Sequence, residues 1–126
     1  MSVSDEVVSL LESILDLNEN VFGLALLDAS GKVLAQTPSW DLRADGPGVV
    51  SSWENNSGSV SIQGIRYITV ENTPERLINT SPSGKGHVMA LAAGDAKIVA
   101  YINPVIGPTQ ILNDAYLIAM QIGKAM

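Results

Sequence analysis

The sequence predicts an α+β fold in which helices cover a central antiparallel sheet of about six or seven strands. Apolar residues recur with helical spacing near both ends of the chain, and short strand-like runs separated by turn residues lie between them. One run, from Val21 to Asp28, is apolar almost without a break, and such a strand must be covered on both faces. Helices that bracket an antiparallel sheet form a layered α+β architecture. The chain of 126 residues fits one domain, residues 1–126.

Composition limits the partners and the compartment. The net charge of −6 argues against general nucleic-acid binding, because neutralising phosphates needs a basic surface, and against strong attachment to anionic lipid. The absence of cysteine excludes disulfides, zinc–thiolate sites and thiol nucleophiles. The N-terminus lacks the basic stretch of a signal peptide, and no apolar run approaches the roughly 20 residues of a membrane helix. We therefore expect a cytoplasmic protein that does not span a membrane.

The N-terminal half predicts a helix, a hairpin and a second, short helix. Apolar residues between Val7 and Leu17 form one face of the first helix. Turn residues at 28–31 join the strand at 21–28 to a second strand at 33–36. The short helix is expected to start near Pro47, which suits a first helical turn. Val49, Val50 and Trp53 then share one face, and Trp40 and Trp53 are predicted to cover the sheet.

The C-terminal half predicts five strands and a final helix. The strands cover residues 59–62, 66–70, 76–80, 87–92 and 97–102. Their connections are short, so they should form an antiparallel meander. After Gly107 and Pro108, apolar residues from Ile111 to Ile122 fall on one face of the last helix.

Catalytic chemistry finds little support in the sequence. His87 is the one histidine, and a set of Ser83, His87 and Asp95 is the kind that a chain of this composition offers by chance. The segment 84–86 lacks the upstream glycine, the Ser or Thr and the following helix of a phosphate loop. No calcium-loop spacing of acidic residues is present. We expect no enzyme activity, no metal and no cofactor.

Two segments instead carry polar residues where a simple amphipathic element does not need them. The first is the outward alternation of Arg66, Ile68, Val70 and Glu71. The second lies on one side of the final helix and comprises Thr109, Gln110, Asn113, Asp114 and Leu117. Each segment is either a binding surface or ordinary solvated surface.

Four segments of the chain resemble the profilin family in their order and spacing. Residues 23–37 resemble its first hairpin, with an apolar strand, an acidic-glycine turn and an Ala-Gln ending. Residues 63–70 resemble its Gly-X-Lys-Tyr strand, and residues 82–86 its glycine-rich tip. Residues 94–110 resemble the last strand and the Pro-Gly-Gln start of its C-terminal helix.

This resemblance implies a fold, a partner and a set of contacts. In profilins the terminal helices cover one face of the sheet and small helices cover the other. The family binds monomeric actin and controls its assembly, so actin or an actin-like protein is the implied partner and the cytoskeleton the implied location. The matched actin-facing positions are Arg66, Ile68, Glu71, Asn79, His87, Met89, Thr109, Gln110, Asn113, Asp114 and Leu117.

Ligands other than actin are less well supported. Profilins hold proline-rich ligands on exposed aromatic rings, whose flat faces suit a preformed polyproline helix. Here the first helix has no aromatic residue, Leu34 replaces the usual tryptophan, and the last helix offers only Tyr116. We therefore expect little binding of proline-rich ligands. The net charge does not support a phosphoinositide ligand.

A roadblock-type domain is the alternative. It also runs helix, hairpin, helix, strands, helix, and it dimerises and regulates small GTPases or motors. The segment 45–48, rich in glycine and proline, makes the middle helix short, and the five-strand meander favours a profilin. A monomer in solution favours the profilin, and a tight dimer favours the roadblock domain.

Overall fold

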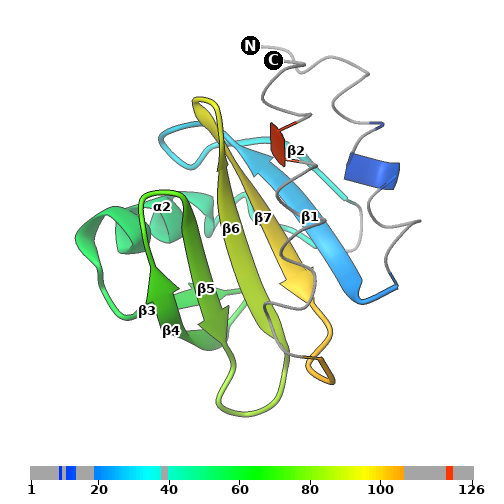
Figure 1. The fold of residues 1–126 in the computed structure, drawn as a ribbon, viewed down its shortest axis with the longest axis vertical. Coiled ribbons are helices and arrows are strands. Elements are labelled where there is room, and N and C mark those ends of the chain that lie inside the picture. The colour runs from blue at the N-terminus through cyan, green and yellow to red at the C-terminus, as the bar shows by residue number, and fades with distance from the viewer. Residues whose placement is uncertain (1–8, 10, 14–18, 38–39, 107–118, 121–126) are drawn as a thin grey trace.

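The computed structural model describes residues 9, 11–13, 19–37, 40–106 and 119–120 (Figure 1). Within these residues the chain forms one antiparallel sheet of seven strands in the order β2-β1-β7-β6-β5-β4-β3. The elements are β1 (Val21–Leu27), β2 (Val33–Gln36), α2 (Gly46–Asn55), β3 (Ser59–Ile62), β4 (Ile65–Asn72), β5 (Arg76–Thr80), β6 (His87–Ala93) and β7 (Ala96–Ile102). This arrangement confirms the predicted α+β fold.

The sheet consists of a meander joined to a hairpin. Strands β3 to β7 follow one another in space as they do in sequence, which is the predicted meander. The hairpin of β1 and β2 attaches through β1, which pairs with β7 along its length. Strand β1 therefore has a neighbour on each side, and β2 and β3 form the two edges of the sheet (Figure 1).

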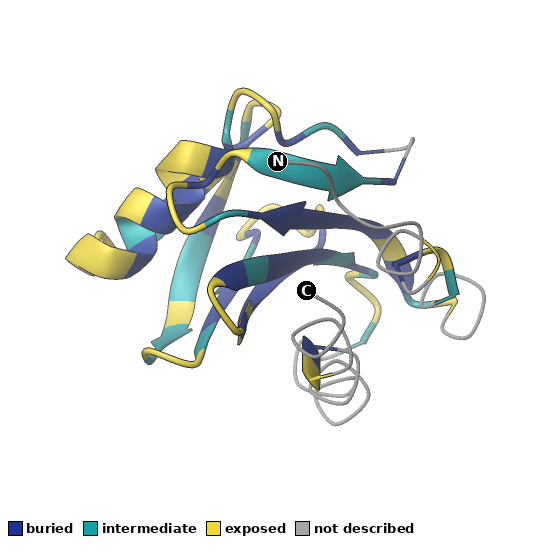
Figure 2. Cartoon of the chain, turned by 90° about the horizontal axis from the view of Figure 1, so that it is seen from above, coloured by how far each residue is buried: buried dark blue, intermediate teal, exposed yellow. Residues whose placement is uncertain are grey.

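Two apolar clusters cover opposite faces of this sheet. One contains the helical residues Leu11 and Ala119 together with Leu24, Ile78 and Met89. The other contains Val49, Val50 and Trp53 of α2. Strand β1 contributes Leu24 and Leu26 to the first cluster and Ala25 and Leu27 to the second. The prediction that this strand is covered on both faces is therefore confirmed, and Figure 2 shows α2 on one side of the sheet.

Helix α2 is held against the hairpin turn by close backbone contact. Pro47 lies in its first turn, as predicted, and Asn56 closes its C-terminus in a left-handed conformation. Gly31, with φ +96°, lies so close that a Cβ there would come within 2.5 Å of the Pro47 Cα. The two tryptophans lie inside, as expected: the Trp53 Nε1 donates to the Thr73 carbonyl at 2.6 Å, and the Trp40 ring stacks on Tyr101 at a centroid distance of 5.5 Å.

The predicted terminal helices are described only in part. Residues 9 and 11–13 are helical near the N-terminus, and residues 119 and 120 are helical near the C-terminus. The remaining residues of both predicted helices lie outside the described part of the chain. Leu11 and Ala119 nevertheless belong to one apolar cluster, on the face opposite α2.

Candidate functional site

A row of side chains crosses four adjacent strands on the face that Leu11 and Ala119 also occupy. The register pairs Ser59 with Ile68, Ile68 with Thr80, and Thr80 with His87. Directly opposed residues of antiparallel strands lie on the same face of a sheet. We call these four residues the strand row. None of them is buried, so the row forms accessible surface.

The position of β3 and β4 explains this accessibility. In Figure 1 the described helical residues of both termini lie near the β1–β2 side, and β3 and β4 lie at the opposite edge of the sheet. Further along β5 and β6 on the same face, Ile78 and Met89 are buried with Leu11 and Ala119. The same face is therefore core around Ile78 and Met89 and surface at the strand row.

A bulge at Val70 brings Glu71 onto this face. Thr69 pairs with Asn79, but Glu71 pairs with Ile78, so Val70 is an extra residue in β4. Simple alternation would place Glu71 on the face opposite Ile68, because successive strand residues point to opposite sides. The extra residue reverses that alternation. Val70 itself is 58% exposed, although it is apolar.

Charged groups lie on either side of these apolar residues. Arg66 is exposed and pairs across the sheet with the exposed Ser61. Glu71 forms an ion pair with Arg76 of the next strand. Ile68 and Val70 therefore lie between Arg66 and the Glu71–Arg76 pair, which gives an apolar centre with charged flanks.

Two predicted contact residues are buried and are corrected here. Asn79 is 0% exposed and lies on the α2 face, where its Oδ1 accepts from the Thr69 hydroxyl at 2.7 Å and its Nδ2 donates to the Val88 carbonyl at 3.3 Å. Met89 is 1% exposed within the opposite apolar cluster. Neither side chain is therefore accessible to a partner. Alternation along β5 turns Asn79 to the α2 face, and the apolar cluster packed on β6 covers Met89.

His87 is half-buried and both of its ring nitrogens have partners. Nδ1 lies 2.9 Å from the Thr80 hydroxyl, and Nε2 lies 2.7 Å from the Ile106 carbonyl oxygen. The Ser83 hydroxyl instead bonds with that of Ser81. The chance set of Ser83, His87 and Asp95 is therefore not assembled as a nucleophile and base.

The other predicted contacts lie outside the described residues. These are Thr109, Gln110, Asn113, Asp114 and Leu117. Thr80 is a further surface residue of this face that was not among the contacts predicted from the sequence. A signal for it exists, because the tip at 81–86 joins neighbouring antiparallel strands and thereby sets Thr80 opposite His87.

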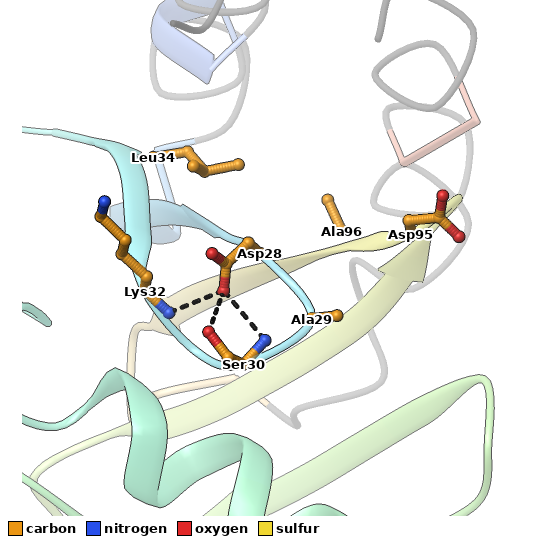
Figure 3. A pocket seen from close by; sticks show the side chains of 7 residues that line it. All are labelled: Asp28, Ala29, Ser30, Lys32, Leu34, Asp95 and Ala96. Atoms are coloured by element: carbon orange, nitrogen blue, oxygen red, sulfur yellow. Dashed lines mark hydrogen bonds between the residues drawn. The ribbon is translucent and has the colours of Figure 1, made fainter. Parts of the chain in front are cut away.

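Two polar networks elsewhere stabilise turns. Figure 3 shows a hollow between the β1–β2 and β6–β7 turns, in which the Asp28 Oδ1 accepts from the Ser30 N–H and hydroxyl and from the Lys32 N–H. The Ser30 hydroxyl, first among these donors, lowers the pKa of Asp28. This carboxylate therefore closes its own turn.

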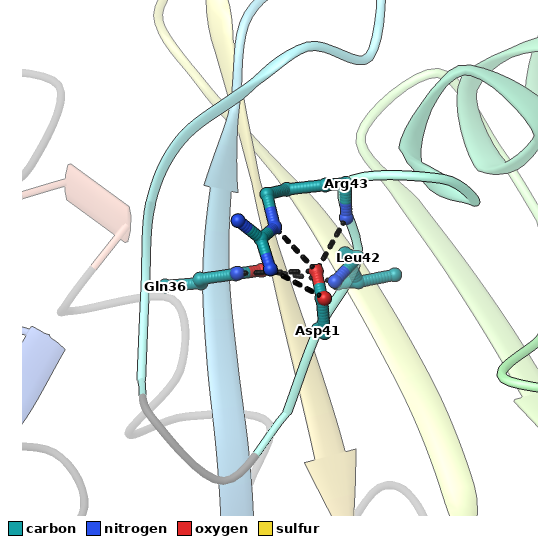
Figure 4. Close-up of polar contacts among 4 residues, drawn as sticks. All are labelled: Gln36, Asp41, Leu42 and Arg43. Atoms are coloured by element: carbon teal, nitrogen blue, oxygen red, sulfur yellow. Dashed lines mark hydrogen bonds and ion pairs between the residues drawn. The ribbon is translucent and has the colours of Figure 1, made fainter.

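The second network joins β2 to the loop that follows it. Asp41 accepts a two-pronged interaction from Arg43 and a further hydrogen bond from Gln36, whose own oxygen accepts from the Leu42 N–H (Figure 4). The Arg43 side chain is the main cause that holds the pKa of Asp41 far below its usual range. The network fixes the loop that carries Trp40 onto the sheet.

In the part of the chain that the structure describes, no three acidic or histidine side chains gather into a metal-binding group. None of its helices has the length and apolar character needed to cross a membrane.

Comparison with known proteins identifies the family. No protein-family model matches the chain. Loki profilin-1 of Lokiarchaeum sp. (strain GC14_75) is 33% identical over 120 residues, which cover 87% of this chain and 90% of that protein. The chain belongs to the profilin family. Among solved structures, the crystal structure of Loki profilin 1 matches with a TM-score of 0.87 at 32% identity, over 98% of this chain and all of that one.

A complex is also among the matched profilin structures. The Loki profilin 2–rabbit actin complex has a TM-score of 0.88 at 30% identity and covers 98% of this chain and 100% of that profilin. Membership of the profilin family decides against the roadblock alternative. The resemblance found in the hairpin, the strand at 63–70, the tip and the final strand is thereby confirmed.

Proposed function

We propose that the chain binds monomeric actin, or an actin-like protein, and slows its spontaneous assembly into filaments. The observation that carries this proposal is the match over nearly the whole chain to a profilin solved in complex with rabbit actin. With actin as the partner, we propose a cytoplasmic location associated with the cytoskeleton. We propose that it acts as a monomer and has no catalytic role.

The accessible face across β3 to β6 supports a protein partner. Interfaces typically combine an apolar centre with a polar rim. Ile68 and Val70 provide the apolar centre, and Arg66 and the Glu71–Arg76 pair provide the rim. We propose Arg66, Ile68 and Glu71 as actin contacts. Asn79 and Met89 are left out of the contact set because they are buried.

The C-terminal contacts stay part of the proposal. The proposed C-terminal contacts follow Ile106 in sequence; they are Thr109, Gln110, Asn113, Asp114 and Leu117. The Ile106 carbonyl is hydrogen-bonded to the side chain of His87, which belongs to the strand row. In sequence the C-terminal contacts recur at the three-to-four-residue spacing of one helix stripe. A continuous contact surface would thus include this stripe together with Arg66, Ile68 and Glu71.

The proposal is tested by titrating monomeric actin with the full chain and by following filament assembly. We expect saturable binding and slower spontaneous assembly. The double variant Arg66→Glu, Ile68→Ser should weaken binding by at least about tenfold, because interfaces concentrate their energy in a few residues. The matched control is Glu54→Lys, an exposed charge reversal on α2, which should bind as wild type does.

Two results would count against the proposal. Absence of binding by folded wild-type chain at about 100 μM would remove actin as the partner. Equal loss of binding in the double variant and in Glu54→Lys would show that the contact face is assigned wrongly.

A parallel titration with a long polyproline peptide should give no saturation, because the rings that usually hold such ligands are replaced.

A further inference from the structure

His87 joins three separate parts of the chain through one imidazole ring. The ring belongs to the first residue of β6, its Nδ1 meets the Thr80 hydroxyl of β5 at 2.9 Å, and its Nε2 meets the Ile106 carbonyl beyond β7 at 2.7 Å. A carbonyl oxygen only accepts hydrogen bonds, so Nε2 must carry a proton. In the neutral ring, Nδ1 then accepts from the Thr80 hydroxyl. Neither nitrogen is left for a polar contact with a partner.

The turn at residues 103–106 is held from its other side by Asn20. The Asn103 N–H donates to the Asn20 carbonyl at 2.8 Å, and the Asn103 Nδ2 donates to the Asn20 Oδ1 at 3.3 Å. Within the turn, the Val105 N–H donates to the Asn103 Oδ1 at 3.0 Å. The Ile106 N–H donates to the Asn103 carbonyl at 3.4 Å, a long and therefore weak bond. The short bond from His87 is thus the better-formed restraint at Ile106.

We propose that His87 is a positioning residue for actin binding: it fixes the Ile106 carbonyl and so sets the direction in which the chain leaves the sheet. This inference rests on the proposed function, since the contacts proposed beyond Ile106 matter only if actin is the partner. It changes the role expected from the family resemblance, in which His87 itself faces actin. His87 acts through Ile106, and the strand row at this end serves to orient the chain.

Two substitutions separate the two sides of the ring. The side-chain amide of Gln reaches about as far as Nε2 of histidine and can donate to the Ile106 carbonyl, whereas that of Asn reaches only as far as Nδ1 and can pair with Thr80. His87→Gln therefore keeps the restraint on Ile106, and His87→Asn loses it. Both variants are polar and uncharged and remove the same ring, and their side chains differ by a single methylene.

The test uses the full-length chain and two measurements. In the free protein, amide hydrogen exchange at Val105 and Ile106 should become at least about fivefold faster in His87→Asn and stay near the wild-type rate in His87→Gln. In titrations with monomeric actin, His87→Asn should bind at least about tenfold more weakly, and His87→Gln should stay within about threefold of wild type.

The two measurements distinguish failure of this inference from failure of the proposed function. If wild type binds actin but exchange at the turn is unchanged in His87→Asn, His87 does not position the turn and the inference is overturned. If both variants lose binding equally, His87 contacts actin directly, which also overturns it. If wild type does not bind actin at all, the proposed function fails, and the role of His87 in actin binding fails with it.

Discussion

Replacing Asn79 by alanine distinguishes a buried structural role from a contact with a partner. The amide is fully buried and makes two hydrogen bonds, one from the Thr69 hydroxyl and one to the Val88 carbonyl. A buried hydrogen bond contributes about 1 kcal/mol net, and the cavity and unpaired groups left behind add to that loss. We therefore expect Asn79→Ala to lower the free energy of unfolding by about 2–3 kcal/mol.

The corresponding change in melting temperature follows from the size of the chain. The entropy of unfolding is about 2.1 cal/mol/K per residue, or roughly 0.26 kcal/mol/K for 126 residues. A loss of about 2–3 kcal/mol then lowers the Tm by about 8–12 °C. Circular dichroism during heating measures this shift, and a titration with monomeric actin at a temperature where the variant is folded measures binding.

Arg66→Ala is the matched comparison, because Arg66 is exposed on the opposite face of the same sheet. Its unfolding free energy should stay within about 0.5 kcal/mol of wild type, whereas its actin affinity should fall. Asn79→Ala should show the reverse, with low stability and near-normal affinity. A Tm change under about 3 °C together with a tenfold loss of affinity in Asn79→Ala would refute the assignment of Asn79 to the interior.

Three further predictions concern backbone packing and ionisation. Gly31→Ala should destabilise the protein by at least about 2 kcal/mol in urea unfolding, because the added Cβ would clash with Pro47 and the φ of this residue is +96°. Gly48→Ala is the control: its Cβ would point into open space, so the substitution should be neutral or stabilising. Burial, followed by the neighbouring Tyr101, raises the pKa of Tyr67 to about 12. The neutral phenol therefore favours folding below its unfolded pKa near 10, and this stabilisation is lost as pH rises through about 12. The unfolding free energy of Tyr67→Phe should thus vary less above pH 10 than that of wild type, and identical profiles would contradict the assignment. Because the pKa of Asp41 is lowered, the ionised carboxylate stabilises the fold above its unfolded pKa near 3.8, and this stabilisation is lost in stronger acid. The Tm difference between wild type and Asp41→Asn should therefore shrink as pH falls below about 3.8. A difference that stays constant would exclude a stabilising role for the Asp41 carboxylate.

The order and type of the described elements could be predicted because they depend on local patterns. Asp28 and Gly31 mark the hairpin turn, Pro47 marks the start of α2, and Gly94 and Asp95 mark the last tight turn. An apolar strand such as β1 also indicates that both its faces are covered, since no face is free to meet water. The family resemblance followed from the same short segments.

Tertiary structure decided which of the predicted contacts are exposed. Alternation in a strand gives two faces but does not say which one is covered, so Asn79 and Met89 could not be recognised as interior from their own segments. The bulge at Val70 depends on the pairing of β4 with β5, and without it Glu71 would lie on the other face. The hydrogen bond between His87 and Ile106 joins residues 19 positions apart, and only the antiparallel pairing of β6 with β7 brings them together.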